Sequence, residues 1–281
     1  SLMRKLKIQC PDIEILTLNT EITKAEEKFP YSEYTNCQHI HCTSYNEIVR
    51  FNPVITLHLA TKTTHRNDTN VIKPILASNI EFGVMLLDAL SKCSAMRLFV
   101  NTGSFAEYLH CSNNFDSAYL YAASKTAFRS FVRYYSDLCG FRYITAIPYS
   151  IYGGNMTVKR LMDYILESMD SSAKIEMTPG AQVLDFIHVD DVSDFYVYVV
   201  QNLEKFIELK NNGEEFHLGT GIGTSIQDLV KLFEHKYNVK CNINWGGIPY
   251  RDKDVMYSVA PIEKNEKSIE WRAKLLLFDK I

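Results

Sequence analysis

The chain has 281 residues, of which 46% are hydrophobic and 22% charged, as in an ordinary globular protein. A net charge of -3 without a basic stripe argues against a nucleic-acid partner, and no uninterrupted apolar run is long enough to cross a membrane. The seven cysteines form no Cys-x-x-Cys pair, so we expect neither a metal site nor disulfides, and a reducing cytoplasm is the expected location.

Strand-like and helix-like segments alternate through the first half of the chain. Near-continuous apolar runs, typical of strands buried on both faces of a parallel sheet, lie at 13–18, 53–60, 96–100 and 143–147. Helical patterns lie at 80–93 and at 117–138, where Gly140 ends the second. The alternation predicts right-handed βαβ units and an α/β fold with a doubly wound parallel sheet.

Beyond Gly153 and Gly154 the pattern loosens into helices and short strands. We therefore expect a first domain at 1–150 and a smaller α/β region at 151–281. Part of 185–220, which includes a helical segment at 192–203, is expected to pack back on the first domain.

Tyr121 and Lys125 are four residues apart in a predicted helix and therefore share one face. An ammonium beside a phenol favours the phenolate. Such a tyrosine can act as a general acid or base that passes a proton to or from a substrate hydroxyl. With 17 tyrosines in the chain, about one Tyr-x-x-x-Lys is expected by chance, so the context of the motif decides its weight.

The context is an ordered series of further motifs. They are His58-Leu59-Ala60 at the end of a strand, Asn79 before a helix, Ser104 after a strand, Pro148 to Gly153, Leu184 to Val192, Phe216 to Gly221, Arg251, and Glu270 to Arg272. In this order they resemble the extended short-chain dehydrogenase/reductase family, the NAD-dependent epimerase/dehydratases of nucleotide sugars. The resemblance covers essentially the whole chain.

This resemblance implies a Rossmann-like first domain and three catalytic residues, with Tyr121 as acid/base beside Lys125 and Ser104. It implies NAD or NADP bound by Asn19, His58, Leu59, Ala60, Asn79, Tyr121, Lys125 and Pro148. It also implies a CDP-, UDP- or dTDP-linked sugar bound by Ser104, Phe105, Ser150 and Arg251. No metal is implied, since the block from His188 to Asp191 is structural in the family.

Relatives commonly form homodimers by packing the Tyr-x-x-x-Lys helix and its neighbour into a four-helix bundle. In this chain Phe128, Phe131, Val132 and Tyr135 are the candidate contacts on that helix. The alternative for these side chains is burial within the monomer.

Departures from the family pattern restrict the reaction. Phe105 and Ala106 stand where 4,6-dehydratases carry Asp and Glu, and Glu107 comes one position too late. This argues against water elimination and leaves a 4-epimerase or a 4-keto reductase. The block from Asp170 to Val192 looks most like reductases that make CDP-dideoxyhexoses for surface polysaccharide.

Three further departures concern binding. Ser150 replaces the usual substrate-contacting Asn, and Leu184 replaces the usual Arg. Asn19 stands where NAD-preferring members carry an acidic residue for the ribose hydroxyls, so NAD and NADP both remain open.

No Gly-x-x-Gly-x-x-Gly phosphate loop precedes Tyr121. Residues 1–6 align best with the helix that follows this loop in the family, so the dinucleotide-binding domain is expected to lack its first strand and loop. A second reading makes 4–8 the first strand. The alternative function is a truncated or non-catalytic family member with an impaired cofactor site, acting as a binding or structural protein.

Overall fold

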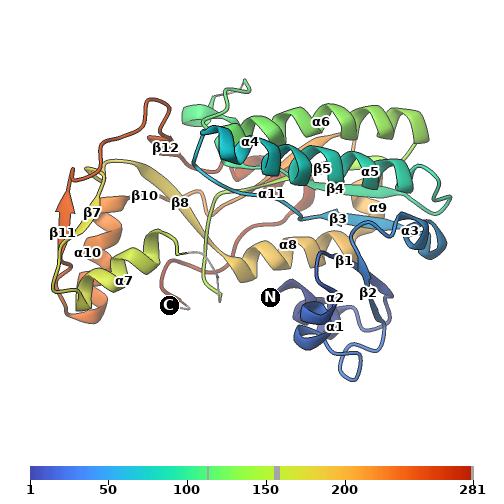
Figure 1. The fold of residues 1–281 in the computed structure, drawn as a ribbon, viewed down its shortest axis with the longest axis horizontal. Helices are drawn as coiled ribbons and strands as arrows, with labels where there is room; N and C mark the ends of the chain where they lie inside the picture. Colours follow the sequence, from blue (N-terminus) through green and yellow to red (C-terminus); the bar gives the residue numbers. More distant parts are fainter. Residues whose placement is uncertain (113, 155–158, 280–281) are drawn as a thin grey trace. The chain divides into compact units, whose positions relative to one another are not determined.

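The computed structural model describes residues 1–112, 114–154 and 159–279, which form two compact units (Figure 1). The first unit consists of Ser1–Gly103, Ser124–Ala146 and Ser193–Phe216. The second consists of Ser104–Ala123, Ile147–Val192 and His217–Ile281. The chain therefore passes between the units several times, and some elements belong to both. The domain boundaries expected at 1–150 and 151–281 stay a prediction.

The first unit holds all or most of six strands and the helices between them. The strands are β1 (Ile15–Asn19), β2 (Cys37–His41), β3 (Ile55–His58), β4 (Leu98–Thr102), β5 (Arg142–Pro148) and β9 (Glu214–Leu218). The α-helices are α1 (Leu2–Gln9), α2 (Ile22–Lys28), α3 (Tyr45–Phe51), α4 (Thr69–Leu76), α5 (Phe82–Leu90), α6 (Leu120–Cys139), α8 (Val189–Gln201) and α9 (Leu203–Ile207), and a π-helical turn, η1 (Ala77–Glu81), joins α4 to α5.

Parallel pairing confirms the predicted α/β class. β1 pairs with β2, and a second sheet has the order β3-β4-β5-β9. The four expected strands are β1, β3, β4 and β5, with ends displaced by a few residues. The reading of 4–8 as a strand is wrong, because these residues lie in α1. Helix α6 ends as expected at Gly140, whose φ of +79° is available to glycine at little cost.

The core of the first unit lies between the sheet and helices α3, α5 and α6. It contains the fully buried Leu87, Phe99, Phe128 and Val132, with Leu16 and Leu18 of β1 packed against it. Because β1 and β4 contribute to the same cluster, the two sheets of this unit lie side by side over one core. Burial of aromatic and aliphatic side chains is the main stabilising contribution to such a layer.

A helical stretch from Thr69 to Leu90 is long and apolar enough to cross a membrane by length and composition. It consists of α4, η1 and α5, and its Ile75 and Leu87 are fully buried in the protein. The sequence shows no uninterrupted apolar run there because Asn79 and Asp88 divide it. The buried residues of this stretch recur at three- and four-residue steps, whereas Leu76 and Met85 are 48% and 44% exposed, as in an amphipathic helix that packs one face on a core.

The sheet of the first unit is interrupted between β1 and β3. In the described part of the chain β1 pairs only with β2, and β3 pairs only with β4. On β1, Ile15 donates to the carbonyl of Asn36 and Asn19 accepts from Cys42, so these alternate residues bond toward β2. The N–H and C=O groups of the intervening residues therefore point toward the open edge.

The same reasoning defines the open edge of β3. The carbonyl of Val54 accepts from Leu98, so Val54 and the residues that alternate with it bond toward β4. The N–H and C=O groups of Ile55 and Leu57 point away from β4. All residues of β1 and three of the four in β3 are only half-buried, whereas four of the five in β4 are buried.

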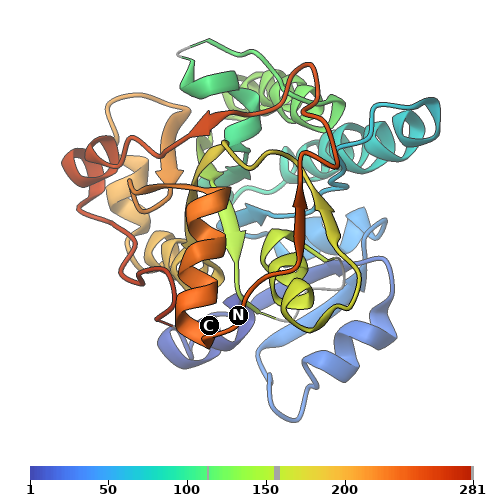
Figure 2. The same ribbon diagram turned by 90° about the vertical axis from the view of Figure 1, so that its left-hand side faces the viewer.

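The second unit combines short strands with three α-helices (Figure 2). Its strands are β6 (Ser150–Tyr152), β7 (Ile175–Met177), β8 (Val183–His188), β10 (Gly223–Ser225), β11 (Ile243–Trp245) and β12 (Tyr257–Ser258). Its α-helices are α7 (Leu161–Asp170), α10 (Ile226–Tyr237) and α11 (Glu263–Ile269), and the 3-10 turns are η2 (Phe105–Glu107) and η3 (Leu109–Cys111). Strand β8 pairs with β6, β10 and β12, and its Phe186 packs with Ile165 of α7 and Phe233 of α10 in the core.

Candidate active site

Helix α6 carries Tyr121 and Lys125 one turn apart near its amino end, as the spacing predicts. Tyr121 is half-buried and Lys125 is 2% exposed. The Nζ of Lys125 donates to the carbonyl oxygen of Thr102, 3.0 Å away, at the end of β4. This bond fixes the ammonium at the carboxyl ends of the parallel strands, where ligands of doubly wound folds bind.

Ser104 begins the short turn η2 in the second unit and is 7% exposed. Its Oγ accepts the N–H of Ala106 at 3.2 Å, and its own N–H donates to the Oε1 of Glu107 at 2.8 Å. The two bonds form a capping box, in which side chain and backbone satisfy each other. Ser104 and the turn that follows it are therefore held in one geometry.

An apolar cluster in the second unit packs the Ser104 turn against the segment around Tyr121. Ala106, Ala122 and Val255 are buried in this cluster, and Phe105 and Tyr121 pack against it. Backbone bonds from Ala118 to Ala106 and from Asp116 to Glu107, both 3.0 Å, join the same two segments. The structure thus brings together the segments that carry Ser104 and Tyr121.

Arg251 lies on a turn next to the residues that lead into α6. Its guanidinium is 5.8 Å from the ring centroid of Tyr119 and 3.9 Å from the carboxylate of Asp254. Burial, followed by the Asp254 carboxylate, raises the pKa of Tyr119 above its ordinary value. The side chain of Arg251 is 54% exposed, which leaves its donors accessible to a phosphate.

Two further predicted substrate contacts, Phe105 and Ser150, and the predicted cofactor contact Pro148 lie on strands and turns of the second unit. Phe105 stacks on Tyr149, with ring centroids 5.7 Å apart. Ser150 pairs with Phe186 in the β6–β8 ladder, and Pro148 ends β5; both are half-buried.

The predicted cofactor contacts of the first unit fall into two groups. Leu59, 42% exposed, and Ala60 follow β3 at its carboxyl end and are accessible. Asn19 is half-buried, and its amide donates to the carbonyl of Thr17 at 3.1 Å and to the Thr17 hydroxyl at 2.8 Å. Its side chain is therefore turned back onto β1.

Asn79 has a supporting position rather than an exposed one. Only 1% exposed, it accepts from the N–H of Lys62 at 2.7 Å and donates to the hydroxyl of Ser124 at 2.9 Å. These bonds tie the loop after Ala60 to helix α6, next to Lys125. Asn79 thus positions residues on both sides of the expected cofactor site.

The ring of His58 does not reach any exposed surface. It is 3% exposed and lies among Phe82, Phe99 and Phe128, with ring centroids 5.0 to 6.1 Å apart. Neither ring nitrogen has a hydrogen-bond partner among the described residues. Burial, with the nearby charge of Lys125, lowers the pKa of His58 to about 3. A cofactor contact from this residue would have to come from its backbone.

These residues fit the nicotinamide half of a dinucleotide better than its pyrophosphate half. Lys125, Leu59 and Ala60 lie at or after strand ends, as nicotinamide and ribose contacts require. The first glycine of the chain is Gly83, so α1 is not preceded by a glycine turn within these residues. Residues 1–82 therefore offer no glycine turn of the kind that binds a pyrophosphate at the amino end of a helix.

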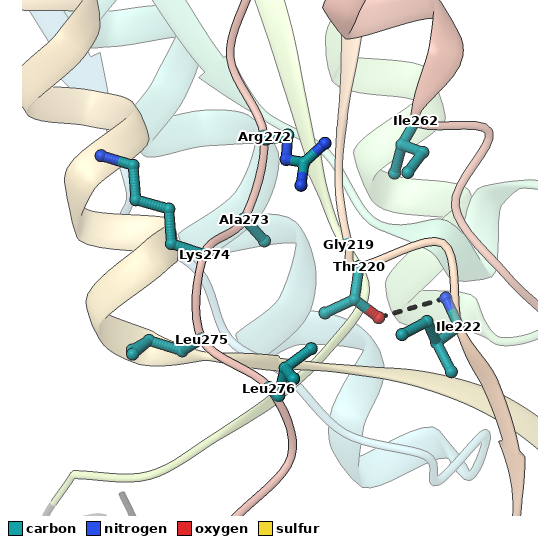
Figure 3. A pocket seen from close by; sticks show the side chains of 9 residues that line it. All are labelled: Gly219, Thr220, Ile222, Ile262, Arg272, Ala273, Lys274, Leu275 and Leu276. Atoms are coloured by element: carbon teal, nitrogen blue, oxygen red, sulfur yellow. Dashed lines mark hydrogen bonds between the residues drawn. The ribbon is translucent and has the colours of Figure 1, made fainter. Parts of the chain in front are cut away.

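The second unit contains a hollow of about 450 Å³ (Figure 3). It is lined by Gly219, Thr220, Ile222, Ile262 and the segment 272–276. Thr220 uses its hydroxyl to accept the N–H of Ile222 at 3.2 Å (Figure 3). None of the predicted catalytic or binding residues lines it.

Two residues with clear local roles were not predicted as site residues. Glu107 is completely buried and closes the capping box on Ser104. The pattern Ser104-x-x-Glu107 is a capping-box signature that is visible in the sequence. Asp185, also completely buried, accepts bonds from Thr220 and Gly221, and only the tertiary contacts show this role.

Comparison with known proteins settles the family. A family model described as the NAD dependent epimerase/dehydratase family matches residues 12–219. The chain belongs to this family. The resemblance of the motifs and the assignment to a class of enzymes are therefore confirmed.

Among curated relatives of this epimerase/dehydratase chain, CDP-abequose synthase of Salmonella typhimurium is 27% identical over 226 residues, or 77% of this chain and 70% of that enzyme. UDP-glucose 4-epimerase 2 of Arabidopsis thaliana is 36% identical over 95 residues, which are 34% of this chain and 26% of that enzyme. The chain is thus a nucleotide-sugar epimerase/dehydratase-family enzyme.

Solved structures confirm the Rossmann-like fold. UDP-glucuronic acid 4-epimerase from Bacillus cereus, in complex with UDP-glucuronic acid and NAD, matches with a TM-score of 0.83 at 16% identity. The match covers 98% of this chain and 90% of that chain. DesIV, a dTDP-glucose 4,6-dehydratase from Streptomyces venezuelae with NAD bound, matches with a TM-score of 0.78 at 14% identity, covering 98% of this chain and 88% of that chain.

Proposed function

We propose that the protein is a nicotinamide-dependent 4-keto reductase of a nucleotide-linked sugar, with 4-epimerisation as the nearest alternative reaction. The observation that carries the proposal is the one-turn spacing of Tyr121 and the buried, carbonyl-anchored Lys125 on α6. The longer of the two relatives' matches, to CDP-abequose synthase, covers 77% of this chain, whereas the 4-epimerase match covers 34%. That difference favours a CDP-linked sugar as the substrate. The resemblance of the block from Asp170 to Val192 to reductases of CDP-dideoxyhexose synthesis favours reduction.

In this mechanism each residue moves or holds a proton near the oxygen at sugar C4. Tyr121 donates its phenolic proton to the oxygen as a hydroxyl forms, and Lys125 favours the phenolate that remains. The Ser104 hydroxyl hydrogen-bonds the same oxygen and polarises the carbonyl. A bound nicotinamide supplies the hydride. For an epimerase, the same residues would first take the proton from the hydroxyl and later return it.

The surroundings of Ser104 argue against a dehydratase. Phe105 is stacked on Tyr149, and Ala106 is buried in an apolar cluster, so neither offers an acid or base. Glu107 is buried and accepts the N–H of Ser104. Elimination of water would require two proton-transferring groups that these positions lack.

The remaining predicted site residues are assigned either to the substrate or to the cofactor. Arg251 holds the diphosphate of the substrate, since its exposed guanidinium suits phosphate oxygens. Phe105 and Ser150 line the sugar pocket, and Pro148, Leu59 and Ala60 contact the cofactor with their backbones or apolar surfaces. Asn19 carries no charge, so it neither repels a ribose 2′-phosphate nor supplies the carboxylate bonds that favour NAD.

A fluorescence titration with NADH and with NADPH tests the cofactor assignment first. Saturable binding of either one would support an assembled site, and the preferred one would then be mixed with a CDP-linked 4-keto-6-deoxyhexose. Oxidation of the cofactor in that mixture supports the reductase. Interconversion of UDP-glucose and UDP-galactose without net oxidation would replace it by the epimerase. Tight cofactor binding without either reaction would contradict both.

The interrupted sheet favours a second candidate function. In this alternative the protein is a family member whose cofactor site is incomplete, and it acts as a binding protein. The open edges of β1 and β3 present the backbone groups of Leu16, Leu18, Ile55 and Leu57 for parallel pairing. Helices α1 and α2 lie on the same face of β1 and β2 (Figure 1). A right-handed crossover through α1 could bring an added strand beside the open edge of β1.

Hydrogen exchange distinguishes a complete from an incomplete cofactor domain. We expect the amides of Leu16, Leu18, Ile55 and Leu57 to exchange at least about tenfold faster than those of β4. A chain extended before Ser1 by a strand of alternating valine and isoleucine and a glycine turn should protect them and strengthen NADH binding. The same extension with a central proline is the control. Slow exchange in the unextended chain would show that the edges are already covered.

A homodimer through α5 and α6 fits the exposed apolar surface of the first unit. Met85, Phe131, Tyr134 and Leu138 are 44%, 39%, 60% and 63% exposed. Phe128 and Val132, expected at such an interface, are instead fully buried in the core. Sedimentation of the wild type and of Phe131→Glu tests the dimer, which the charge should dissociate.

A cytoplasmic location is consistent with the state of the cysteines. All seven are free thiols in the structure, and burial raises the pKa of five of them, Cys10, Cys37, Cys93, Cys139 and Cys241. Unpaired thiols are typical of a reducing compartment. Thiol titration of the protein isolated under non-reducing conditions should count seven.

A further inference from the structure

Glu107 is a carboxylate with 0% exposure in a turn that the proposed reaction does not use directly. It accepts the N–H of Ser104 at 2.8 Å, and in the same turn the Oγ of Ser104 accepts the N–H of Ala106 at 3.2 Å. A buried carboxylate is costly unless hydrogen bonds compensate it. Because Glu107 lies three residues after a candidate catalytic serine and bonds to it, we ask what this carboxylate does for the serine.

The two bonds determine what the serine hydroxyl can do. A hydroxyl has one proton to donate and two lone pairs to accept. One lone pair of Ser104 is used by the N–H of Ala106, and the structure gives its Oγ no other bond among the described residues. The proton is therefore available for an outside acceptor, and a hydroxyl that already accepts a bond is a stronger donor.

The turn that holds Ser104 is also tied to the segment before Tyr121. The carbonyl of Glu107 accepts the N–H of Asp116 at 3.0 Å, and Tyr108 forms a parallel bridge with Asp116. The N–H of Ala118 bonds the carbonyl of Ala106, also at 3.0 Å. These bonds use the backbone carbonyls of Ala106 and Glu107, so a change of the Glu107 side chain keeps them and acts on Ser104.

We propose that Glu107 is a positioning residue that holds Ser104 as a hydrogen-bond donor to the oxygen at sugar C4. The inference rests on the proposed function for its catalytic consequence, and on the capping box for its geometry. Glu107 acts on Ser104 through a hydrogen bond, because its fully buried carboxylate accepts the N–H of Ser104 and is removed from solvent.

Two substitutions separate positioning from acid–base chemistry. Glu107→Gln keeps an oxygen that can accept the N–H of Ser104, so we expect kcat within about threefold of wild type and an unchanged pH profile. Glu107→Ala removes the acceptor, and we expect kcat to fall by about 10- to 100-fold with a smaller change in KM. If kcat falls equally in the two variants, Glu107 has a chemical role and the positioning role is wrong. If kcat of Glu107→Ala equals that of wild type, Glu107 has neither role.

A double-mutant cycle tests whether Glu107 acts through Ser104. In a Ser104→Ala background the Glu107→Ala change should alter kcat by less than about twofold, because the hydroxyl that it positions is gone. Additive losses would contradict the proposal. The matched control is Asp228→Ala, which removes the partner of the cap residue Ser225 at the start of α10 and should leave kcat unchanged.

The amide signal of Ser104 provides a readout that does not depend on turnover. In Glu107→Ala its proton resonance should move upfield and exchange faster, whereas in Glu107→Gln it should stay near the wild-type position. If Glu107→Ala does not fold, the Gln variant and its cycle with Ser104→Ala still decide the question. If the wild type is inactive but the Ser104 amide shifts in Glu107→Ala as expected, the proposed reaction is wrong and the capping geometry is supported. If the Ser104 amide does not shift in Glu107→Ala, the capping geometry is wrong.

Discussion

The ammonium of Lys125 donates to the carbonyl oxygen of Thr102 across 3.0 Å, and this bond connects helix α6 to the end of β4. At 2% exposure the side chain is almost completely removed from solvent. Burying a Lys is costly without a partner, so the bond to the strand carbonyl stabilises both its charge and its direction. The first two predictions below depend on this anchored Lys and on Tyr121, one turn before it.

In the proposed mechanism, replacing Tyr121 by Phe removes the hydroxyl that transfers the proton and keeps the aromatic ring. We expect kcat to fall by about 10²- to 10⁴-fold, the usual range for loss of a general acid. The circular dichroism spectrum and the midpoint of urea unfolding should stay close to wild type. Tyr134→Phe, on the same helix and 60% exposed, is the control and should retain full activity.

Lys125→Met keeps the length of the side chain but removes its charge and its bond to Thr102. We expect NADH binding to weaken by about tenfold or more and kcat to fall as well, since the ammonium supports both ribose and phenolate. Isothermal titration measures the first effect. The exposed Lys92, paired with Asp88 at 2.8 Å, gives the matched Lys92→Met control, and equal behaviour of the two variants would contradict the assignment.

Arg251→Ala should raise KM for the nucleotide sugar by about 10- to 100-fold with little change in kcat, because a charge-assisted phosphate bond is lost from binding. Initial-rate kinetics at saturating cofactor measure it. Lys253→Met is the control: its ion pair with Asp116, 2.6 Å long, is about half exposed and is not aimed at the substrate in this assignment. A KM shift confined to Lys253→Met would move the diphosphate contact to that residue.

The buried His58 predicts a pH dependence of stability. Its pKa is lowered from 6.5 to about 3 by burial, so the unfolded chain takes up a proton that the folded protein excludes. The free energy of unfolding should therefore decrease as the pH falls below 6.5, by up to roughly 1.4 kcal/mol per pH unit from this residue. Urea unfolding of wild type and His58→Phe at several pH values tests this. An identical dependence in both proteins would exclude His58 as its source.

Asp185 predicts a large loss of stability on substitution. Its carboxylate accepts the N–H and hydroxyl of Thr220 at 2.8 and 2.7 Å, and the N–H groups of Gly221 and Ala260 at 2.8 and 3.2 Å. Asp185→Ala would leave these donors buried and unpaired, at a cost of about 3 kcal/mol or more in the free energy of unfolding. Chemical denaturation measures it. A loss below about 1 kcal/mol would mean that water replaces the carboxylate.

Much of the candidate site could be read from local sequence. The spacing of Tyr121 and Lys125 places them on one helix face, and the Ser104-x-x-Glu107 pattern encodes the capping box. Against the family pattern, Glu107 stands out only as an acid one position too late. His58 shows the limit of such reasoning. Its place at a strand end fits the family motif, but only the packing of Phe82, Phe99 and Phe128 shows that its ring points into the core.

The sequence by itself determined the order of the elements, the parallel α/β class and the family. These depend on hydrophobic period, turn residues and motif spacing, which are local properties of a chain. The tertiary structure alone decided which strand edges stay unpaired, that Asn79 supports a loop and that Asp185 holds the Thr220 turn. Each of these depends on hydrogen bonds between residues distant in sequence, and such pairings arise only when the chain packs.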